Sequence, residues 1–178
     1  NLINALAYAK HPAYFSFLIE HALTHENHEV ALHAGLALEG IRKAFPFLIN
    51  AVEHEDPNVA LRAIGVLGNI GSKNAVPALT KALGHENPSV ARNAAFALGN
   101  IRSDKAVTAL TKALEHEDTS VVSSAAVALR ENGSPKAVTA LTKALEHKNP
   151  HVVNSAASAL GEIYSPKTRA ILEAWRKR

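Results

Sequence analysis

A repeat of 31 residues is the feature of this sequence that most limits its possible folds. The segment KAVTALTKALEH at 105–116 recurs unchanged at 136–147, and other residues recur at the same spacing. These residues are His54, His85, His116 and His147; Val59, Val90, Val121 and Val152; and Leu67, Leu98, Leu129 and Leu160. An earlier copy fits with a shift of 29 residues. Such a period is typical of chains that stack one supersecondary unit, because a single unit cannot bury its apolar face alone.

Each unit contains two apolar stripes with helical spacing. In the unit that begins at Ser72, Val76, Leu79 and Leu83 form the first stripe, and the second runs from Val90 to Ile101. Residues that cap helix N-termini precede both stripes: Ser72, Ser103, Ser134 and Ser165 before the first, and Asp56, Asn87, Asp118 and Asn149 before the second. The sequence therefore predicts two antiparallel helices per unit.

Composition agrees with a helical protein of this kind. Of the 178 residues 47% are hydrophobic but only 5% are aromatic, so small aliphatic side chains must build the core. The absence of cysteine excludes thiolate metal sites and cysteine nucleophiles. The net charge of +3 is concentrated in the last twelve residues, where five basic residues oppose one glutamate. The rest of the chain is nearly neutral, which does not favour nucleic-acid binding.

The order of these motifs resembles a known family. The pattern AVxALxKAL, a turn xHExP, and then SVxxxAAxALGxI are similar to the HEAT-like repeats named after the phycobilisome lyases, over residues 11–163. The resemblance implies an all-α fold, a right-handed α-solenoid of about five two-helix repeats. We expect a single domain, 1–178. Its parts are a partial repeat helix at 1–10, repeats at 11–41, 42–71, 72–102, 103–133 and 134–164, and a C-terminal capping helix at 165–178.

In solenoids of this type the exposed face of the second helices lines the concave side, and we expect it to bind another protein or peptide. The repeat register places the following residues on that face: His33, Leu36, Arg62, Asn69, Arg92, Asn93, Phe96, Asn100, Ser124, Val127, Glu131, Asn154 and Ser158. Phe96 is the candidate aromatic anchor. The resemblance leaves a bilin lyase-type subunit as an alternative function, and HEAT-like DNA glycosylases suggest a nucleic-acid-binding module as a further one.

Histidines raise the question of a metal site. His21, His25 and His28 form a cluster in which the first two are four residues apart, the spacing that can place two imidazoles on one helical face. The repeated histidines of the turns are too far apart to share an ion, and we expect them to donate to free carbonyls at the end of each first helix. We predict no metal site, no cofactor and no enzyme activity, since no nucleophile elbow, phosphate-binding loop or carboxylate pair is found.

The two ends of the chain differ in character. Apolar residues begin at Leu2 without a polar cap, so we expect further repeats or self-association at the N-terminal end. At the other end, 165–178 has the amphipathic pattern of a capping helix. No apolar run is long enough to cross a membrane and no signal-peptide pattern opens the sequence, from which we expect a cytoplasmic location and no membrane partner.

Overall fold

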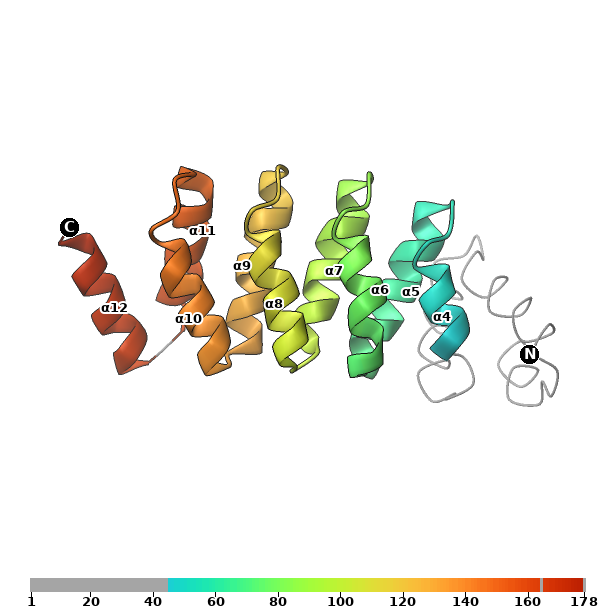
Figure 1. Ribbon diagram of the computed structural model, residues 1–178, viewed down its shortest axis with the longest axis horizontal. Helices are drawn as coiled ribbons and strands as arrows, with labels where there is room; N and C mark the ends of the chain where they lie inside the picture. Colours follow the sequence, from blue (N-terminus) through green and yellow to red (C-terminus); the bar gives the residue numbers. More distant parts are fainter. Residues whose placement is uncertain (1–44, 164, 178) are drawn as a thin grey trace.

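A computed structural model of the protein describes residues 45–163 and 165–177. Every regular element in these ranges is helical, which confirms the predicted all-α solenoid. The elements are α4 (Phe45–Ala51), α5 (Pro57–Ile70), η2 (Lys73–Ala75), α6 (Val76–Ala82), α7 (Pro88–Asn100), α8 (Asp104–Ala113), α9 (Thr119–Asn132), α10 (Pro135–Ala144), α11 (Pro150–Gly161) and α12 (Pro166–Arg176). Figure 1 shows them as helix pairs stacked side by side, ending in α12.

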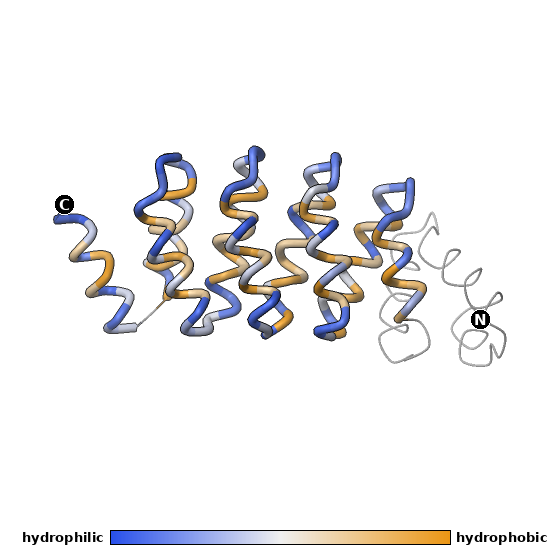
Figure 2. The backbone as a smooth tube through the Cα atoms, viewed as in Figure 1, coloured by the Kyte–Doolittle hydropathy of each residue, from blue (hydrophilic) through white to orange (hydrophobic). Residues whose placement is uncertain are grey.

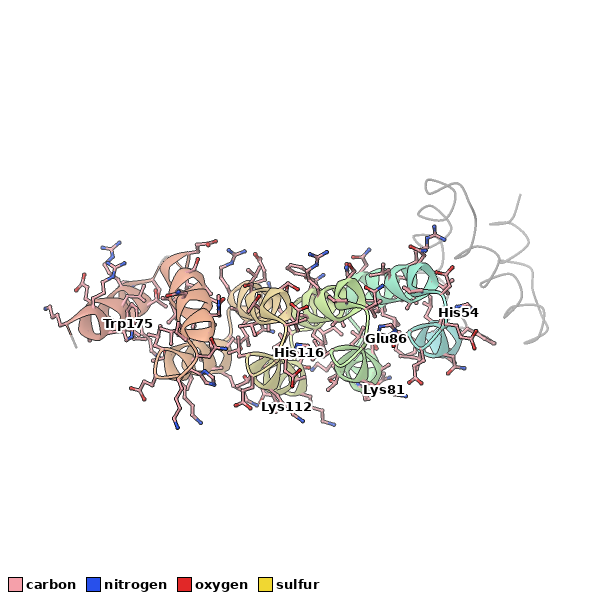
Figure 3. The ribbon with its side chains drawn as sticks, turned by 90° about the horizontal axis from the view of Figure 1, so that it is seen from above. His54, Lys81, Glu86, Lys112, His116 and Trp175 are labelled. Carbon is pink, nitrogen blue, oxygen red and sulfur yellow. The ribbon has the colours of Figure 1, made fainter. Side chains whose placement is uncertain are left out.

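The helices form two rows. Helices α4, α6, α8 and α10 make the first-helix row, and α5, α7, α9 and α11 make the second-helix row, as Figure 3 shows from above. Neighbouring helices of the second-helix row contact each other more extensively than neighbours in the first-helix row. Closer spacing in one row is the arrangement expected on the inner side of a curved stack. The second-helix row is therefore the side on which a concave binding surface is expected.

Side-chain caps fix where the helices begin. Asn149 Oδ1 accepts from the backbone N–H of His151 at 2.9 Å, and Asp56, Asn87 and Asp118 cap their helices in the same way. Ser103 Oγ accepts from the N–H of Ala106 at 3.2 Å at the start of α8, and the other three predicted serines also act as N-caps. Each cap satisfies a backbone donor that the first helical turn leaves without a partner. The capping prediction is confirmed.

A continuous apolar core lies between the two rows. The repeated leucines of the second helices are completely buried, and most of the core consists of alanine, leucine and valine side chains. Figure 2 shows hydrophilic residues at the turns between paired helices and hydrophobic residues recurring along the helices. Among these core residues alanine has the smallest side chain, and the alanines let neighbouring helices approach closely.

Two glycines show how close that approach is. A Cβ atom added at Gly68 would lie 2.9 Å from the Cβ of Ala97, and one added at Gly99 would lie 2.9 Å from the Cβ of Ala128. Real Cβ atoms do not come this near, so α5, α7 and α9 can stack at this spacing only with glycine at both positions. Close packing of neighbouring second helices thus accounts for glycine at positions 68 and 99.

The C-terminal helix covers the last pair of the stack. Leu172 of α12 is buried, and Ile171 and Trp175 pack beside it against the core. Thr168 Oγ1 donates to the carbonyl of Ile163 at 2.6 Å, which ties the start of α12 to the end of the preceding repeat. The amphipathic helix predicted here is thus present. In the ranges that the structure describes, no helix combines the length and apolar character needed to cross a membrane.

Candidate binding surface

The exposed stripe of the second-helix row is the candidate binding surface. It repeats every 31 residues, so Leu61, Arg92, Ser123 and Asn154 occupy one position and Gly65, Phe96, Val127 and Ser158 another. Phe96 is 42% exposed, and within the described residues it is the large hydrophobic side chain that stands out to solvent. Arg92 lies one helical turn before Phe96 on α7, is exposed, and forms no ion pair with any residue of the described ranges.

The exposed stripe of α5 has open space at Gly65. Gly65 holds the position on α5 that Phe96 holds on α7, and a Cβ added at Gly65 would meet no atom within 4 Å. Helix packing therefore does not require glycine at 65, in contrast to Gly68 three residues later. Glycine inside a helix costs about 1 kcal/mol relative to alanine. Glycine at 65 leaves the exposed stripe of α5 without a side chain at the position that Phe96 holds on α7.

The structure places most of the predicted contact residues at the surface. Asn69, Arg92, Phe96, Asn100, Glu131, Asn154 and Ser158 are exposed, and Arg62, Asn93 and Val127 are half-buried. His33 and Leu36 lie outside the described residues, as do the candidate metal ligands His21, His25 and His28. That these residues contact a partner stays a prediction.

Ser124 is the exception, and its predicted exposure is wrong. Only 5% of Ser124 is accessible, and its Oγ donates to the carbonyl of Ser120 at 2.8 Å within α9. Asn93, at the same repeat position, likewise donates to the carbonyl of Ser89 at 2.8 Å. The exposed serine is the preceding one, Ser123, whose hydroxyl lies 3.3 Å from that of Ser155 on α11. On α9 the exposed stripe thus passes through Ser123 and not through Ser124.

Arg130 is a residue of this surface that sequence reasoning missed. It stands where Gly68, Gly99 and Gly161 stand in the other repeats, and its guanidinium binds Glu131 on its own helix and Glu162 beyond the end of α11. The hydrogen bond with the Glu131 carboxylate raises the pKa of Arg130, so the guanidinium stays protonated. The charges of Glu131 and Glu162 are therefore partly neutralised. The sequence did contain a signal that could have identified it, because arginine at position 130 interrupts the series of glycines at 68, 99 and 161.

The repeated histidines lie in the turns, as predicted, but their chemical role differs from the prediction. Nδ1 of His54, His85, His116 and His147 accepts a hydrogen bond from the backbone N–H two residues later, at 2.9–3.0 Å. A backbone N–H can only donate, so Nδ1 carries no proton and Nε2 carries it in the neutral ring. Each histidine therefore fixes the residue that caps the second helix.

No other arrangement in the described ranges suggests chemistry of its own. Histidines and acidic residues there do not gather in groups of three that could hold a metal ion. The turn histidines are already engaged through Nδ1, and the serines of the stripe bond to each other or to helix carbonyls. The surface offers one exposed ring and an unpaired guanidinium, groups of the kinds that are enriched at protein interfaces.

A family model for HEAT repeats matches residues 45–130 and 123–178, which together include most of the chain. The protein therefore belongs to the HEAT repeat family. No sequence among curated proteins matches it.

Solved structures share this fold. An engineered protein is 24% identical over 99% of this chain and 84% of its own, with a TM-score of 0.53. The CpcE–CpcF complex of phycocyanin lyase from Nostoc sp. PCC7120 is 22% identical over 92% of this chain and 71% of the matched chain, with a TM-score of 0.58. The Pds5–Scc1 complex is 16% identical over 92% and 32%, with a TM-score of 0.58. At these identities the likeness extends to the solenoid fold alone.

Proposed function

We propose that the protein is a non-catalytic binding module that holds a protein or peptide segment against its second-helix row. The observation that carries the proposal is the exposed ring of Phe96, with the unpaired Arg92 one turn away and open space at the equivalent position of α5, Gly65. Aromatic side chains, phenylalanine among them, and arginine are both enriched at protein interfaces. A partner segment with an apolar side chain beside a carboxylate would match it.

Two other functions draw less support from the residues. The second helices carry only Arg62, Arg92 and Arg130 as basic residues, and Arg130 is paired with glutamates, so nucleic acid would meet little positive charge. A lyase subunit that works with a partner would also use a protein-binding surface, so the complex formed by CpcE and CpcF is compatible with the proposal. Addition of a bilin would distinguish a lyase-type subunit from a protein-binding module, because a lyase-type subunit should change the visible absorption of the pigment.

A random peptide library displayed on phage provides the test. Sequences selected by the intact protein should combine an apolar residue with an acidic one, and synthetic versions should bind at least about tenfold more weakly to a protein carrying Phe96→Ala and Arg92→Ala. Thr108→Ala, an exposed change on the first-helix row, is the matched control and should leave binding unchanged. Equal binding by the double variant, with its helical content intact, would refute the placement of the site.

A further inference from the structure

A cavity of about 550 Å³ lies at the edge of the stack where each second helix connects to the next first helix, the lower edge in Figure 1. It is lined by residues at the start of η2, around the connection from α7 to α8, and around the connection from α9 to α10. Its volume is within the range of about 300–1,000 Å³ that is usual for small-molecule sites. None of the residues that line it belongs to the predicted contact residues of the second-helix row.

Three residues of this lining depart from the repeat. Arg102 occupies the position that Gly71 and Gly133 hold in the neighbouring connections. Asn132 occupies a position that is isoleucine in the other repeats, and Lys73 one that is aspartate or proline in the repeats that follow. The three departures come from three successive repeats, yet they line one cavity.

The next boundary along the stack shows what the repeat has without these departures. One repeat later, the same three positions hold Asp104, Gly133 and Ile163. They provide an acidic group, no side chain and an apolar side chain, in place of two basic groups and an amide. A basic, polar lining is therefore particular to this cavity and is not a property of the repeat.

The cavity has more positive than negative charge. Lys73 and Arg102 are exposed and form no ion pair with any residue that the structure describes. Asp104 is the acidic residue of the lining, and its Oδ2 lies 3.8 Å from Nζ of Lys136, which also donates to the Asp104 carbonyl at 3.3 Å. With Lys136 included, three basic groups stand against one acidic group, an excess of two positive charges.

The neighbouring acidic residue of α9 does not cancel this excess, because Glu131 is bound to Arg130. A single lysine without an ion pair is ordinary at a protein surface. What sets Lys73 apart is that it shares a cavity with a second unpaired cation and with a buried amide that lacks a partner. Two cations that line one cavity repel each other, and an anion between them would relieve that repulsion.

Asn132 is an independent sign of a ligand. It is 7% exposed, and its Nδ2 has no hydrogen-bond partner. Its Oδ1 accepts a long hydrogen bond of 3.4 Å from the N–H of Ser134, so the amide can turn toward the cavity at little cost. A buried donor without an acceptor destabilises a fold. Isoleucine would avoid that loss, and so would a ligand oxygen that accepts from Nδ2.

The starts of two helices add further donors. Oγ of Ser103 and Oγ of Ser134 accept from the N–H groups of Ala106 and Ala137, and neither hydroxyl donates to any residue in the described ranges. The N–H of Asp104, at the first position of α8, has no acceptor within the helix. These groups suit an oxyanion, since N–H groups at a helix N-terminus and charged side chains bind it together.

We propose that this cavity binds a phosphate group, either as the free ion or as the head group of a small phosphorylated compound. Charge selects this ligand, because a phosphate group carries about −1.5 to −2 at pH 7 and matches the excess of two positive charges. A carboxylate would leave one cation unpaired. The guanidinium of Arg102 and the ammonium of Lys73 bind the phosphate oxygens, and Nδ2 of Asn132 donates to one of them.

The test follows amide signals of the whole chain by NMR at pH 7 and constant ionic strength, with inorganic phosphate, glycerol 1-phosphate, acetate and glycerol as probes. Both phosphates should shift the signals of Ser103, Asp104 and Ser134 and saturate with a dissociation constant of about 1 mM or lower. Acetate should bind at least about tenfold more weakly, and glycerol should not bind. Tighter binding of glycerol 1-phosphate than of inorganic phosphate would identify an esterified phosphate as the ligand, and the reverse order would identify the free ion.

Two charge variants locate the site. Arg102→Gln and Lys73→Gln should each weaken phosphate binding about tenfold, as expected for the loss of one charge-assisted hydrogen bond. Lys112→Gln is the matched control, because it removes the same charge from an exposed lysine at the other end of α8. It should bind phosphate as the wild type does.

Asn132→Ile is the decisive variant, because it restores the residue that the other repeats have. It should raise the melting temperature and at the same time weaken phosphate binding about fivefold, since one donor is lost. A residue with a purely structural role would change the melting temperature without this loss of binding.

The absence of saturable shifts, binding of acetate as tight as that of phosphate, equal effects of Lys112→Gln and Arg102→Gln, or wild-type binding by Asn132→Ile would overturn the proposal. These outcomes are independent of the phage test, because none of these variants changes Phe96 or Arg92.

Discussion

Nδ1 of His85 accepts a hydrogen bond from the backbone N–H of Asn87 at 2.9 Å, and Asn87 in turn caps α7. The same relationship recurs in each turn between a first and a second helix of the described repeats. The histidine thus positions the capping residue, and the capping residue starts the helix. Two residues apart in sequence, they act as one unit of the turn.

His85→Leu should lower the free energy of unfolding by about 1 kcal/mol, because the N–H of Asn87 loses its acceptor. His85→Asn should recover most of the loss, since an asparagine side chain can accept from the N–H two residues later. Urea unfolding followed by circular dichroism measures both changes. Equal stability of the leucine variant and the wild type would show that water replaces the imidazole.

Two glycines on α5 should respond to alanine in opposite ways. Gly65→Ala should raise the free energy of unfolding by about 0.5–1 kcal/mol, because no atom lies within 4 Å and alanine favours the helix. Gly68→Ala should lower it by about 1–3 kcal/mol, because the added methyl would meet Ala97 at 2.9 Å. Thermal unfolding of both variants under one condition checks the prediction, and a change of the same sign in both would contradict it.

The cap of α9 should make stability depend on pH in the acid range. Hydrogen bonds from the side chain and backbone N–H of Ser120 lower the pKa of Asp118. A lowered pKa in the folded state means that the carboxylate stabilises the fold above its unfolded pKa of about 4. That contribution is lost as the pH falls further, through the folded pKa.

Asp118→Asn keeps a capping side chain without the titration. Its melting temperature should therefore lie below that of the wild type at pH 7 and approach it at low pH. Asn149→Asp is the reciprocal change at the equivalent cap of α11 and should acquire the dependence that Asp118→Asn loses. Parallel melting curves at every pH would contradict the assignment.

Asn132→Ile should stabilise the protein by about 1 kcal/mol or more. Asn132 stands where the other repeats have Ile70, Ile101 and Ile163, it is 7% exposed, and its Nδ2 is buried without a partner. Isoleucine would remove the unsatisfied donor and restore the apolar side chain of the repeat, at the loss of a weak hydrogen bond of 3.4 Å from Ser134 N–H. Chemical denaturation measures the gain, and a less stable variant would mean that a bound water satisfies the amide.

The repeat predicted those features of the fold that depend on local chemistry. Serine before proline at 134–135 and asparagine before proline at 149–150 specify helix starts within a few residues, so the caps could be predicted. The role of His116 could not, because the same imidazole can donate or accept and only the direction of the chain in the turn decides which.

Features that depend on how one repeat lies on the next were harder to predict. Ser124 and Ser123 differ by one residue, and which of them is exposed depends on the rotation of α9 against its neighbours. Arg130 finds Glu162 thirty-two residues later only because α9 and α11 are adjacent in the stack.

The change from Gly99 to Arg130 along the second-helix row has a mechanical consequence. Glycine lets the backbones of α5, α7 and α9 touch, so those helices share a short and stiff contact, whereas an extended side chain with ion pairs at its tip joins α9 to α11. Ion pairs at a surface stabilise a contact between helices less than close packing of their backbones does. Since α9 and α11 also contact each other less extensively than α5, α7 and α9 do, we expect a force applied between the ends of the stack to separate this pair of second helices first.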